Sequence, residues 1–517
     1  MGPVPFVMKV EVVRSWLYVP EKSSPLVIAN AFKSLYRCGS QSTFSIKLNF
    51  KKERWSSPAI PALEGDKNWG NLIEICDDNN GTVKETCKFD GTWGPSQWIG
   101  SLVALGALIS GPVTGFCVER FGRKTTMLLL SAPFVLGWLL ITYAESVAMI
   151  YAGRLVTGFC GGAFSLAAPV YIGETSEDSV RGTLGAGFQL MVTVGILFVY
   201  VVGDAVSWEW LSLISGFGPL VFLVLMIFPP ESPRWLISVG KHTEASESLR
   251  WLRGASSSQD VEEELAVIQK SVNESKQQSA TFKDLLAPAI LKPTLIALAL
   301  MLFQQLSGVN AVIFYTTEIF LDAGSDLEPA LCTIIVGIVQ VVATVLSSIL
   351  MDRAGRKLLL LVSDAAMCLF LVLLGVFFYF KDNDTETAEK IGWLPLVSLI
   401  FFIVFFSLGY GPIPWLMMGE LLPPHVKGLA SAIATSFNWI LAFIVTMFFK
   451  DLKNGIGAAW CYWLFAIVCA AGTVFVFIFV PETKGKSLDE IQRYFGAPES
   501  TPNPQSSNSE KTEEPEP

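Results

Sequence analysis

Six side-chain amides lie inside long apolar stretches of this 517-residue sequence, at Gln189, Gln304, Gln305, Asn310, Gln340 and Asn438. An unpaired amide is costly in an apolar environment, so each must bond to a neighbouring group, to water or to a solute. Amides both donate and accept hydrogen bonds, and they therefore match the hydroxyl groups of a sugar. The set indicates a binding site for a neutral solute rich in hydroxyl groups. For any single residue, a bond across to a neighbouring helix is the alternative.

Aromatic residues accompany these amides in the same stretches, at Phe314, Tyr315, Trp415 and Trp439. An aromatic face packs well on the apolar side of a sugar ring, so these are candidate stacking partners. A Gly-Pro-Ile-Pro segment at 411–414 directly precedes Trp415. Because proline removes a helical hydrogen bond, we expect the helix to break there and to act as a gate beside the site. A plain structural kink is the alternative.

Charged residues form two sets that repeat along the chain. The first comprises Glu119, Arg120, Arg123, Glu174, Arg181, Glu231 and Arg234, and the second comprises Asp352, Arg353, Arg356, Glu420, Lys427 and Glu482. A carboxylate and a guanidinium at neighbouring helix ends form charge-assisted hydrogen bonds. We predict that both sets act as conformational latches, which hold helix ends together and open when the two halves move apart. Ordinary anchoring of basic loops at the cytoplasmic face is the alternative.

Composition places these residues in a membrane. Hydrophobic residues make up 51% of the chain and charged residues only 16%, against about 25% in a typical soluble protein. The formal net charge of -9 provides no basic field for a nucleic acid. Only His242 and His425 are present, so we expect no metal site, no cofactor and no enzymatic activity.

Eleven apolar runs are long enough to cross a bilayer as helices. They lie near 98–118, 126–144, 147–171, 185–203, 209–229, 293–315, 329–351, 357–380, 393–418, 428–449 and 459–480. The short-loop bases fall in alternate loops, which places those loops in the cytoplasm. We therefore predict an all-α, polytopic membrane protein with an extracellular loop at 55–97, a cytoplasmic loop with short helices at 230–291, and a cytoplasmic tail at 481–517.

The predicted extracellular loop carries Cys76, Cys87 and the glycosylation sequon that begins at Asn80. Together these indicate an oxidising, glycosylated exterior with a Cys76–Cys87 disulfide. Two free thiols and a chance sequon are the alternative. A second sequon begins at Asn383, and we predict glycosylation there as well.

Two charged residues lie inside the apolar runs. Arg154 is either a functional buried charge or one member of a structural pair inside the bundle. Asp364 lies near the cytoplasmic start of the run at 357–380. We expect Asp364 to cap a helix or to pair with a base of a loop.

The charged sets also show that the chain is duplicated. The segment at 119–124 recurs at 352–357, and the Pro-Glu pair at 230–231 recurs at 481–482 in the same order. This order predicts an N-terminal helical half at 98–229 and a C-terminal helical half at 292–480. A solute site between two such halves is typical of a transporter.

The motifs together resemble the sugar porter family of the major facilitator superfamily. They are ERFGRK at 119–124, DRAGRK at 352–357, PESPRWL at 230–236, QQLSGVN at 304–310, GPIPW at 411–415 and PETKG at 481–485. Within that family, the segments at 411–423 and 481–495 are most similar to the insect facilitated trehalose transporters. The resemblance implies the major facilitator fold of two six-helix halves.

The resemblance also implies a role for individual residues. Gln189 matches the sugar-site glutamine of the fifth helix, and Gln304, Gln305 and Asn310 match the seventh-helix set. Trp415 matches the tenth-helix tryptophan and Asn438 the eleventh-helix asparagine. Three positions depart from the family pattern, because Gln340 replaces an asparagine, Phe314 replaces the first of two tyrosines, and Lys427 replaces an arginine. Lysine cannot form the bidentate pair with a carboxylate, so the latch at Lys427 should be weaker.

We therefore predict a monomeric, multi-pass carrier of the plasma membrane that moves a mono- or disaccharide, trehalose among the candidates, by alternating access. The alternatives are a proton-coupled sugar symporter and a sugar sensor that does not transport. Partners are expected to be the sugar and the lipid bilayer.

One part of the chain does not fit this family. Residues 1–54 contain a basic cluster where the first of twelve helices should lie, so only eleven spans are readable and the first helix is apparently missing. We expect that this segment comes from an incorrect or alternative first exon. A proton-coupled member would carry an aspartate on that helix, and it cannot be sought here. A chain that truly lacked the helix could be a non-functional product.

Overall fold

The computed structural model of the chain describes residues 95–257, 259–277, 284–324, 327–486 and 488–495. Residues 1–54, Cys76, Asn80 and Cys87, for which the sequence makes predictions, lie outside these ranges. Within them every regular element is a helix, and eleven helices or interrupted helix pairs are long and apolar enough to cross a membrane. Each coincides with one of the eleven predicted runs, so the prediction of an all-α, polytopic membrane protein is confirmed.

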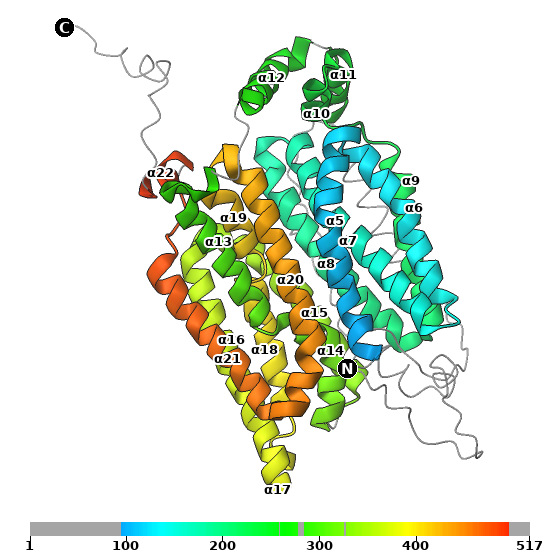
Figure 1. Cartoon of the computed structure of the whole chain (residues 1–517), viewed down its shortest axis with the longest axis vertical. Helices are drawn as coiled ribbons and strands as arrows, with labels where there is room; N and C mark the ends of the chain where they lie inside the picture. The colour runs from blue at the N-terminus through cyan, green and yellow to red at the C-terminus, as the bar shows by residue number, and fades with distance from the viewer. Residues whose placement is uncertain (1–94, 258, 278–283, 325–326, 487, 496–517) are drawn as a thin grey trace, which may run out of the picture.

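The described part of the first half contains five helices that are long and apolar enough to span a membrane, and Figure 1 shows how they are arranged. They are α5 (Pro95–Phe121), α6 (Arg123–Thr142), α7 (Val147–Thr175), α8 (Asp178–Ala205) and α9 (Trp208–Met226). Helix α7 packs on both α5 and α6, and α6 also packs on α9. Glycine allows α5 and α7 to approach closely, because a Cβ atom at Gly158 would lie 2.3 Å from the Val103 carbonyl oxygen.

Short helices follow the first half and lie together at one end of the molecule (Figure 1). They are α10 (Pro233–Ser238), α11 (His242–Arg253) and α12 (Glu262–Gln277), with the 3-10 turns Gln259–Val261 and Asp284–Leu286. Arg253 fixes them to the first half, because its guanidinium binds Glu264 at 2.7 Å and donates to the Thr175 carbonyl at 3.0 Å.

The second half contains two spans that are interrupted. Its helices are α13 (Pro288–Leu306), α14 (Val309–Ala323), α15 (Pro329–Ala354), α16 (Arg356–Asn383), α17 (Thr385–Lys390), α18 (Leu394–Leu408), α19 (Ile413–Leu421), α20 (Pro424–Ile456), α21 (Ala458–Phe479) and α22 (Leu488–Tyr494). One span divides into α13 and α14 at Gly308, which has a φ of 82°. The other divides into α18 and α19 at residues 409–412, which we call the helix break. The predicted interruption beside Trp415 is therefore present.

The two halves meet along two pairs of helices, α5 with α20 and α8 with α15. Figure 1 shows α5, in blue, running beside α20, in orange. Near the ends opposite the short helices, the Gln97 amide donates to Asp451 at 2.8 Å, and Ser101 contacts the Met447 sulfur at 3.3 Å. The Tyr200 hydroxyl donates to the Ile313 carbonyl at 3.0 Å. These outer contacts hold the halves together on the side predicted to face the exterior.

Candidate functional site

Four of the six predicted amides form one hydrogen-bonded chain, which we call the amide network. The Asn438 amide donates to Gln304 Oε1 at 2.9 Å, and Gln305 donates to Asn438 Oδ1 at 2.8 Å. Asn310 in turn donates to Gln305 Oε1. Asn438 is 1% exposed, so these bonds satisfy groups that would otherwise be costly to bury. The network brings together α13, α14 and α20.

The amide network also reaches the helix break. The Gln304 side chain donates to the carbonyl oxygens of Tyr410 and Gly411, at 2.6 Å and 3.0 Å. Those carbonyls are available because the backbone leaves the helix at this point, and Pro414 lacks the amide hydrogen that would bond the Tyr410 carbonyl four residues before it or the Gly411 carbonyl three residues before it. The two interrupted spans are therefore joined to each other through one side chain.

The remaining two amides lie near the junction of α8 and α15. Gln340 on α15 is buried, and Gln189 on α8 is half-buried. A Cβ atom at Gly337, one turn from Gln340, would approach the Tyr200 ring of α8 to 3.0 Å. Tyr200 lies three helical turns from Gln189, so the two share a face of α8. No bond joins these two amides to the amide network in the part of the chain that the structure describes.

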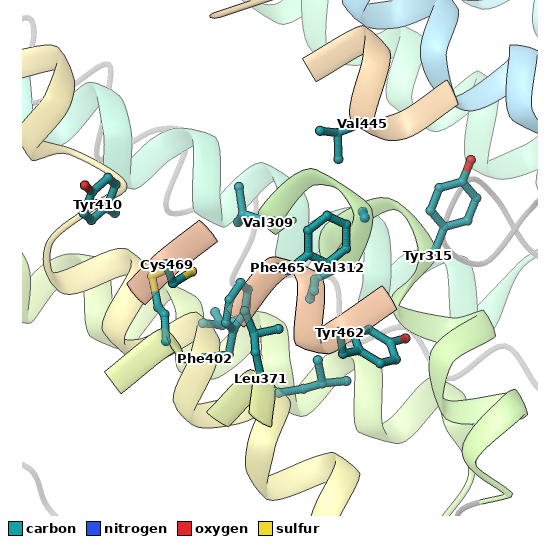
Figure 2. Packing of buried hydrophobic residues seen from close by; sticks show 14 of the residues in the cluster. Val309, Val312, Tyr315, Leu371, Phe402, Tyr410, Val445, Tyr462, Phe465 and Cys469 are labelled. Carbon is teal, nitrogen blue, oxygen red and sulfur yellow. The ribbon is translucent and has the colours of Figure 1, made fainter. Parts of the chain in front are cut away.

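The predicted aromatic residues have different surroundings. Tyr315 is fully buried, stacks on Phe449 with ring centroids 5.2 Å apart, and donates to the Thr446 carbonyl at 3.1 Å. It therefore packs between α14 and α20 (Figure 2). Phe314 is half-buried, and Trp415, on α19 directly after the helix break, is 36% exposed. Of the aromatic residues predicted for the sugar, Trp415 has the most accessible side chain.

The described members of the first charged set gather where α5 and α7 end and α6 begins. Arg123 pairs with Glu174 at 2.8 Å, and Glu174 also accepts from Ser232 at 2.6 Å. Glu231 accepts from the backbone amides of Arg123 and Lys124, both at 3.0 Å, at the start of α6. A carboxylate there satisfies orphan N–H groups and complements the helix dipole. This carboxylate therefore ties α6 to the segment that follows α9.

The second charged set repeats this arrangement. Arg356 pairs with Glu420 at 3.2 Å, and Glu482 accepts from the backbone amides of Arg356 and Lys357, at 3.0 Å and 3.1 Å. Burial by itself would raise the pKa of the Glu482 carboxyl, but the backbone donors, which include Lys484, hold it below the ordinary value. The structure thus shows the duplication in its contacts as well as in its motifs.

Both ion pairs join helices of the same half. Separation of the two halves does not require either ion pair, Arg123–Glu174 or Arg356–Glu420, to break. That the charged sets act as conformational latches stays a prediction. The side chains of Glu119, Arg120 and Arg353 are exposed, and Arg234 is half-buried. The side chains of Arg181 and Asp352 lie outside the described part of the structure.

Lys427 does not bond to Glu420. Its ammonium donates to the Gly419 carbonyl at 2.7 Å, whereas Glu420 Oε2 is buried without a hydrogen bond. In the first half both oxygens of Glu174 are bonded, one to Arg123 and the other to Ser232. Glu420 Oε2 thus lacks the partner that Ser232 supplies to Glu174, and the hydroxyl of Thr483, which follows Glu482 as Ser232 follows Glu231, is also without a hydrogen bond.

The expectation for Asp364 is wrong. Its side chain is 0% exposed, and neither carboxyl oxygen bonds to a helix end or a loop base. Arg154, by contrast, donates from Nε to the Ile99 carbonyl at 3.0 Å and so joins α7 to α5. Asn383 is exposed at the end of α16, and glycosylation there stays a prediction.

Sequence reasoning missed the outer contacts between the halves, the carbonyls of the helix break and two ion pairs within the second half. Lys450 pairs with Glu318 at 3.0 Å, and Lys453 pairs with Asp322 at 2.6 Å, which joins α20 to α14. The regular spacing of these charges on the outer ends of two spans was a usable signal. No sequence signal indicates that Tyr410 accepts a hydrogen bond from Gln304, because the accepting group is its backbone carbonyl.

Comparison with known proteins places this architecture among transporters. The family model described as "Sugar (and other) transporter" matches residues 75–495. The chain is 47% identical over 407 residues to the facilitated trehalose transporter Tret1 of Culex quinquefasciatus, covering 78% of each sequence. Tret1 of Anopheles gambiae is also 47% identical over 407 residues, but the chain spans only 51% of its length. A Tret1-2 homologue of Drosophila simulans is 47% identical over 414 residues, covering 80% of this chain and 84% of the homologue.

Solved structures agree with the fold. The proton:xylose symporter XylE bound to 6-bromo-6-deoxy-D-glucose is 26% identical, with a TM-score of 0.62, over 78% of this chain and 89% of XylE. A partially occluded inward-open form of XylE from E. coli gives a TM-score of 0.64 at 25% identity, over 76% of this chain and 89% of XylE.

Proposed function

Since the chain belongs to the "Sugar (and other) transporter" family, we propose that it carries trehalose down its gradient across the plasma membrane. Facilitative transport of a sugar by a multi-pass membrane protein is the activity of the family to which the chain belongs. The choice of trehalose rests on the relatives from three insects that carry this name at 47% identity.

The amide network is the observation that supports the sugar site best. We propose that sugar hydroxyls replace the bonds that the amides now make to each other and to the helix break. Because each exchange substitutes one neutral hydrogen bond for another, its net free energy is small, about 1 kcal/mol per bond. A carrier needs such a balance, since it must release its solute on the far side.

The full proposed site includes the residues that flank the amide network. These residues are Gln189, Gln304, Gln305, Asn310, Phe314, Tyr315, Gln340, Trp415 and Asn438. Gln189 and Gln340 approach from the junction of α8 and α15, so a bound sugar would be enclosed between the halves. Trp415 would supply the aromatic face. We propose that the two charged sets stabilise each half as it rocks about this site, and that the carrier works as a monomer.

Uptake of radiolabelled trehalose, glucose and polyols into oocytes that express the full chain tests the proposal. Gln304→Ala and Asn310→Ala are expected to abolish trehalose uptake while surface expression persists. Gln269→Ala on α12 is the matched amide control, because Gln269 is half-buried outside the membrane-spanning helices and, among the described residues, its amide donates to Asn273 of the same helix. Unchanged uptake in both site variants would contradict the assignment of the site, and absence of any sugar uptake would contradict the function.

Proton–sugar symport is the second candidate, supported by the 26% identity to the proton:xylose symporter. Alkalinisation of the medium on addition of sugar would favour symport over the uniport proposed here. A sugar sensor would bind sugar without accumulating label inside the cell, so the same uptake assay separates it from both carriers.

A further inference from the structure

Asp364 is a fully buried carboxyl that the proposed transport cycle does not use. It lies on α16, eight residues after Arg356, which places it about 12 Å along the helix from the predicted cytoplasmic end. Neither oxygen has a hydrogen-bond partner. The titratable groups that face it are the phenol of Tyr410 and the thiols of Cys469 and Cys368, all of them neutral at physiological pH.

The surroundings of Asp364 are shaped to hold a carboxyl without charge. A Cβ atom at Gly472 on α21 would lie 2.2 Å from Asp364 Oδ2, so only glycine leaves space for the group there. The Phe303 ring closes the same space, at 3.2 Å from that Cβ position. Helices α18 and α21, which pack against α16, contain no charged residue. Among the described residues, no hydrogen bond or ion pair joins Asp364 to a cation.

A carboxylate in such a pocket is strongly disfavoured, and a bound proton removes its charge. An ionisable group in this position inside a membrane-spanning bundle is a candidate functional site. We propose that Asp364 is a proton-binding site, which holds its proton in this conformation and exchanges it with the cytoplasm when the helix break moves away.

The helix break connects this proton site to the amide network, so the inference rests on the proposed sugar site. The Tyr410 amide donates to Ser363 Oγ at 3.1 Å, next to Asp364, while the Tyr410 carbonyl accepts from Gln304 at 2.6 Å. Ser363 Oγ also donates to the Phe405 carbonyl at 2.7 Å. Figure 2 shows Tyr410 in the non-helical link, with Cys469 on the neighbouring α21. A sugar that displaces Gln304 therefore removes one of the two bonds that hold the backbone of Tyr410, whose phenol faces Asp364.

The position of Asp364 makes a distinctive prediction for transport. Because the proton enters and leaves on the cytoplasmic side, it crosses no membrane, and the site differs from that of a symporter. When the cytoplasm is alkaline, Asp364 would lose its proton while the helix break is displaced from it. The ionised carboxylate would then slow the return of the helix break to the position that it has in this structure. For one proton, sugar uptake should fall by up to about tenfold per unit of cytoplasmic pH.

The first experiment measures trehalose uptake by oocytes at fixed external pH, with cytoplasmic pH set by butyrate or ammonium. Wild-type uptake should fall as the cytoplasm becomes alkaline, whereas Asp364→Asn, which stays neutral, should lose that dependence. Asp382→Asn is the matched control, because Asp382 is an exposed carboxyl at the far end of the same helix. Equal pH dependence in wild type and Asp364→Asn, or none in wild type, would overturn the proposal.

The second experiment does not depend on transport. Infrared spectra of the purified full chain should contain a protonated-carboxyl band at neutral pH that Asp364→Asn removes and Asp382→Asn retains. A spectrum without such a band would overturn the proton site even if sugar moves. Should Asp364→Asn fail to fold, Tyr410→Phe keeps the carboxyl and removes the facing phenol, which would donate to Asp364 once the carboxyl has lost its proton. It should therefore move the fall in uptake to higher cytoplasmic pH, and an unmoved response would count against the proposal. Absence of uptake by wild type would refute the proposed function alone.

Discussion

Replacing Gly122 with alanine should destabilise the first half more than any ordinary surface substitution. Gly122 has a φ of 96° and a ψ of 168°, a conformation that costs a residue with a side chain about 1–3 kcal/mol. A Cβ atom there would also lie 2.4 Å from Glu231 Oε2 and 2.8 Å from its Cδ. The new methyl group must therefore displace the carboxylate that caps α6.

Loss of a helix cap costs about 0.5–2 kcal/mol, so the two effects together come to about 1.5–5 kcal/mol. Thermal melting of the purified protein in detergent, followed by fluorescence-detected size exclusion, measures the change. We expect Gly122→Ala to lower the apparent melting temperature by several degrees.

Gly173→Ala provides the control for this prediction. Gly173 lies in α7 with helical backbone, and no atom approaches its Cβ position within 4 Å. Alanine there should leave stability unchanged or raise it by about 0.5–1 kcal/mol. If Gly122→Ala melts at the temperature of wild type or of Gly173→Ala, the assignment of Glu231 as a structural cap is wrong.

Three further predictions concern single residues. Gln305→Ala removes the centre of the amide network, and we expect trehalose kcat/KM to fall about 30-fold, or about 2 kcal/mol, in the uptake assay. Lys427→Arg should raise the melting temperature by bonding the unsatisfied oxygen of Glu420, and an unchanged value would argue against the weakened pair. The lowered pKa of Glu482 stabilises the fold above the ordinary glutamate value of about 4.3, and this stability is lost as pH falls through the lowered pKa. Glu482→Gln should therefore melt lower than wild type at pH 7 and show a weaker acid dependence.

The sequence predicted correctly those features that depend only on the cost of exposing apolar groups to water or of burying polar groups away from it. An apolar run of about 20 residues has few options besides a membrane helix, so all eleven spans could be predicted. The cost of burying an amide identified Gln304, Gln305, Asn310 and Asn438 before their mutual bonds were known. The proline-rich segment at 411–414 located the helix break for a similar reason.

The remaining features depend on which surfaces meet, and one sequence does not contain that information. Arg123 and Glu174 are separated by 51 residues, and only the packing of α7 against α5 and α6 shows that they pair within one half. Asp364 lacks a base because α18 and α21, which carry no charge, are the helices packed on it. The acceptor role of the Tyr410 carbonyl depends on local backbone geometry.

The two interrupted spans, α13–α14 and α18–α19, both belong to the second half, whereas the five described spans of the first half are each continuous. Among the described spans, the backbone joints are therefore confined to the second half. Substitutions that loosen or stiffen the backbone should consequently change turnover when they fall in the second half, and mainly folding yield when they fall in the described spans of the first.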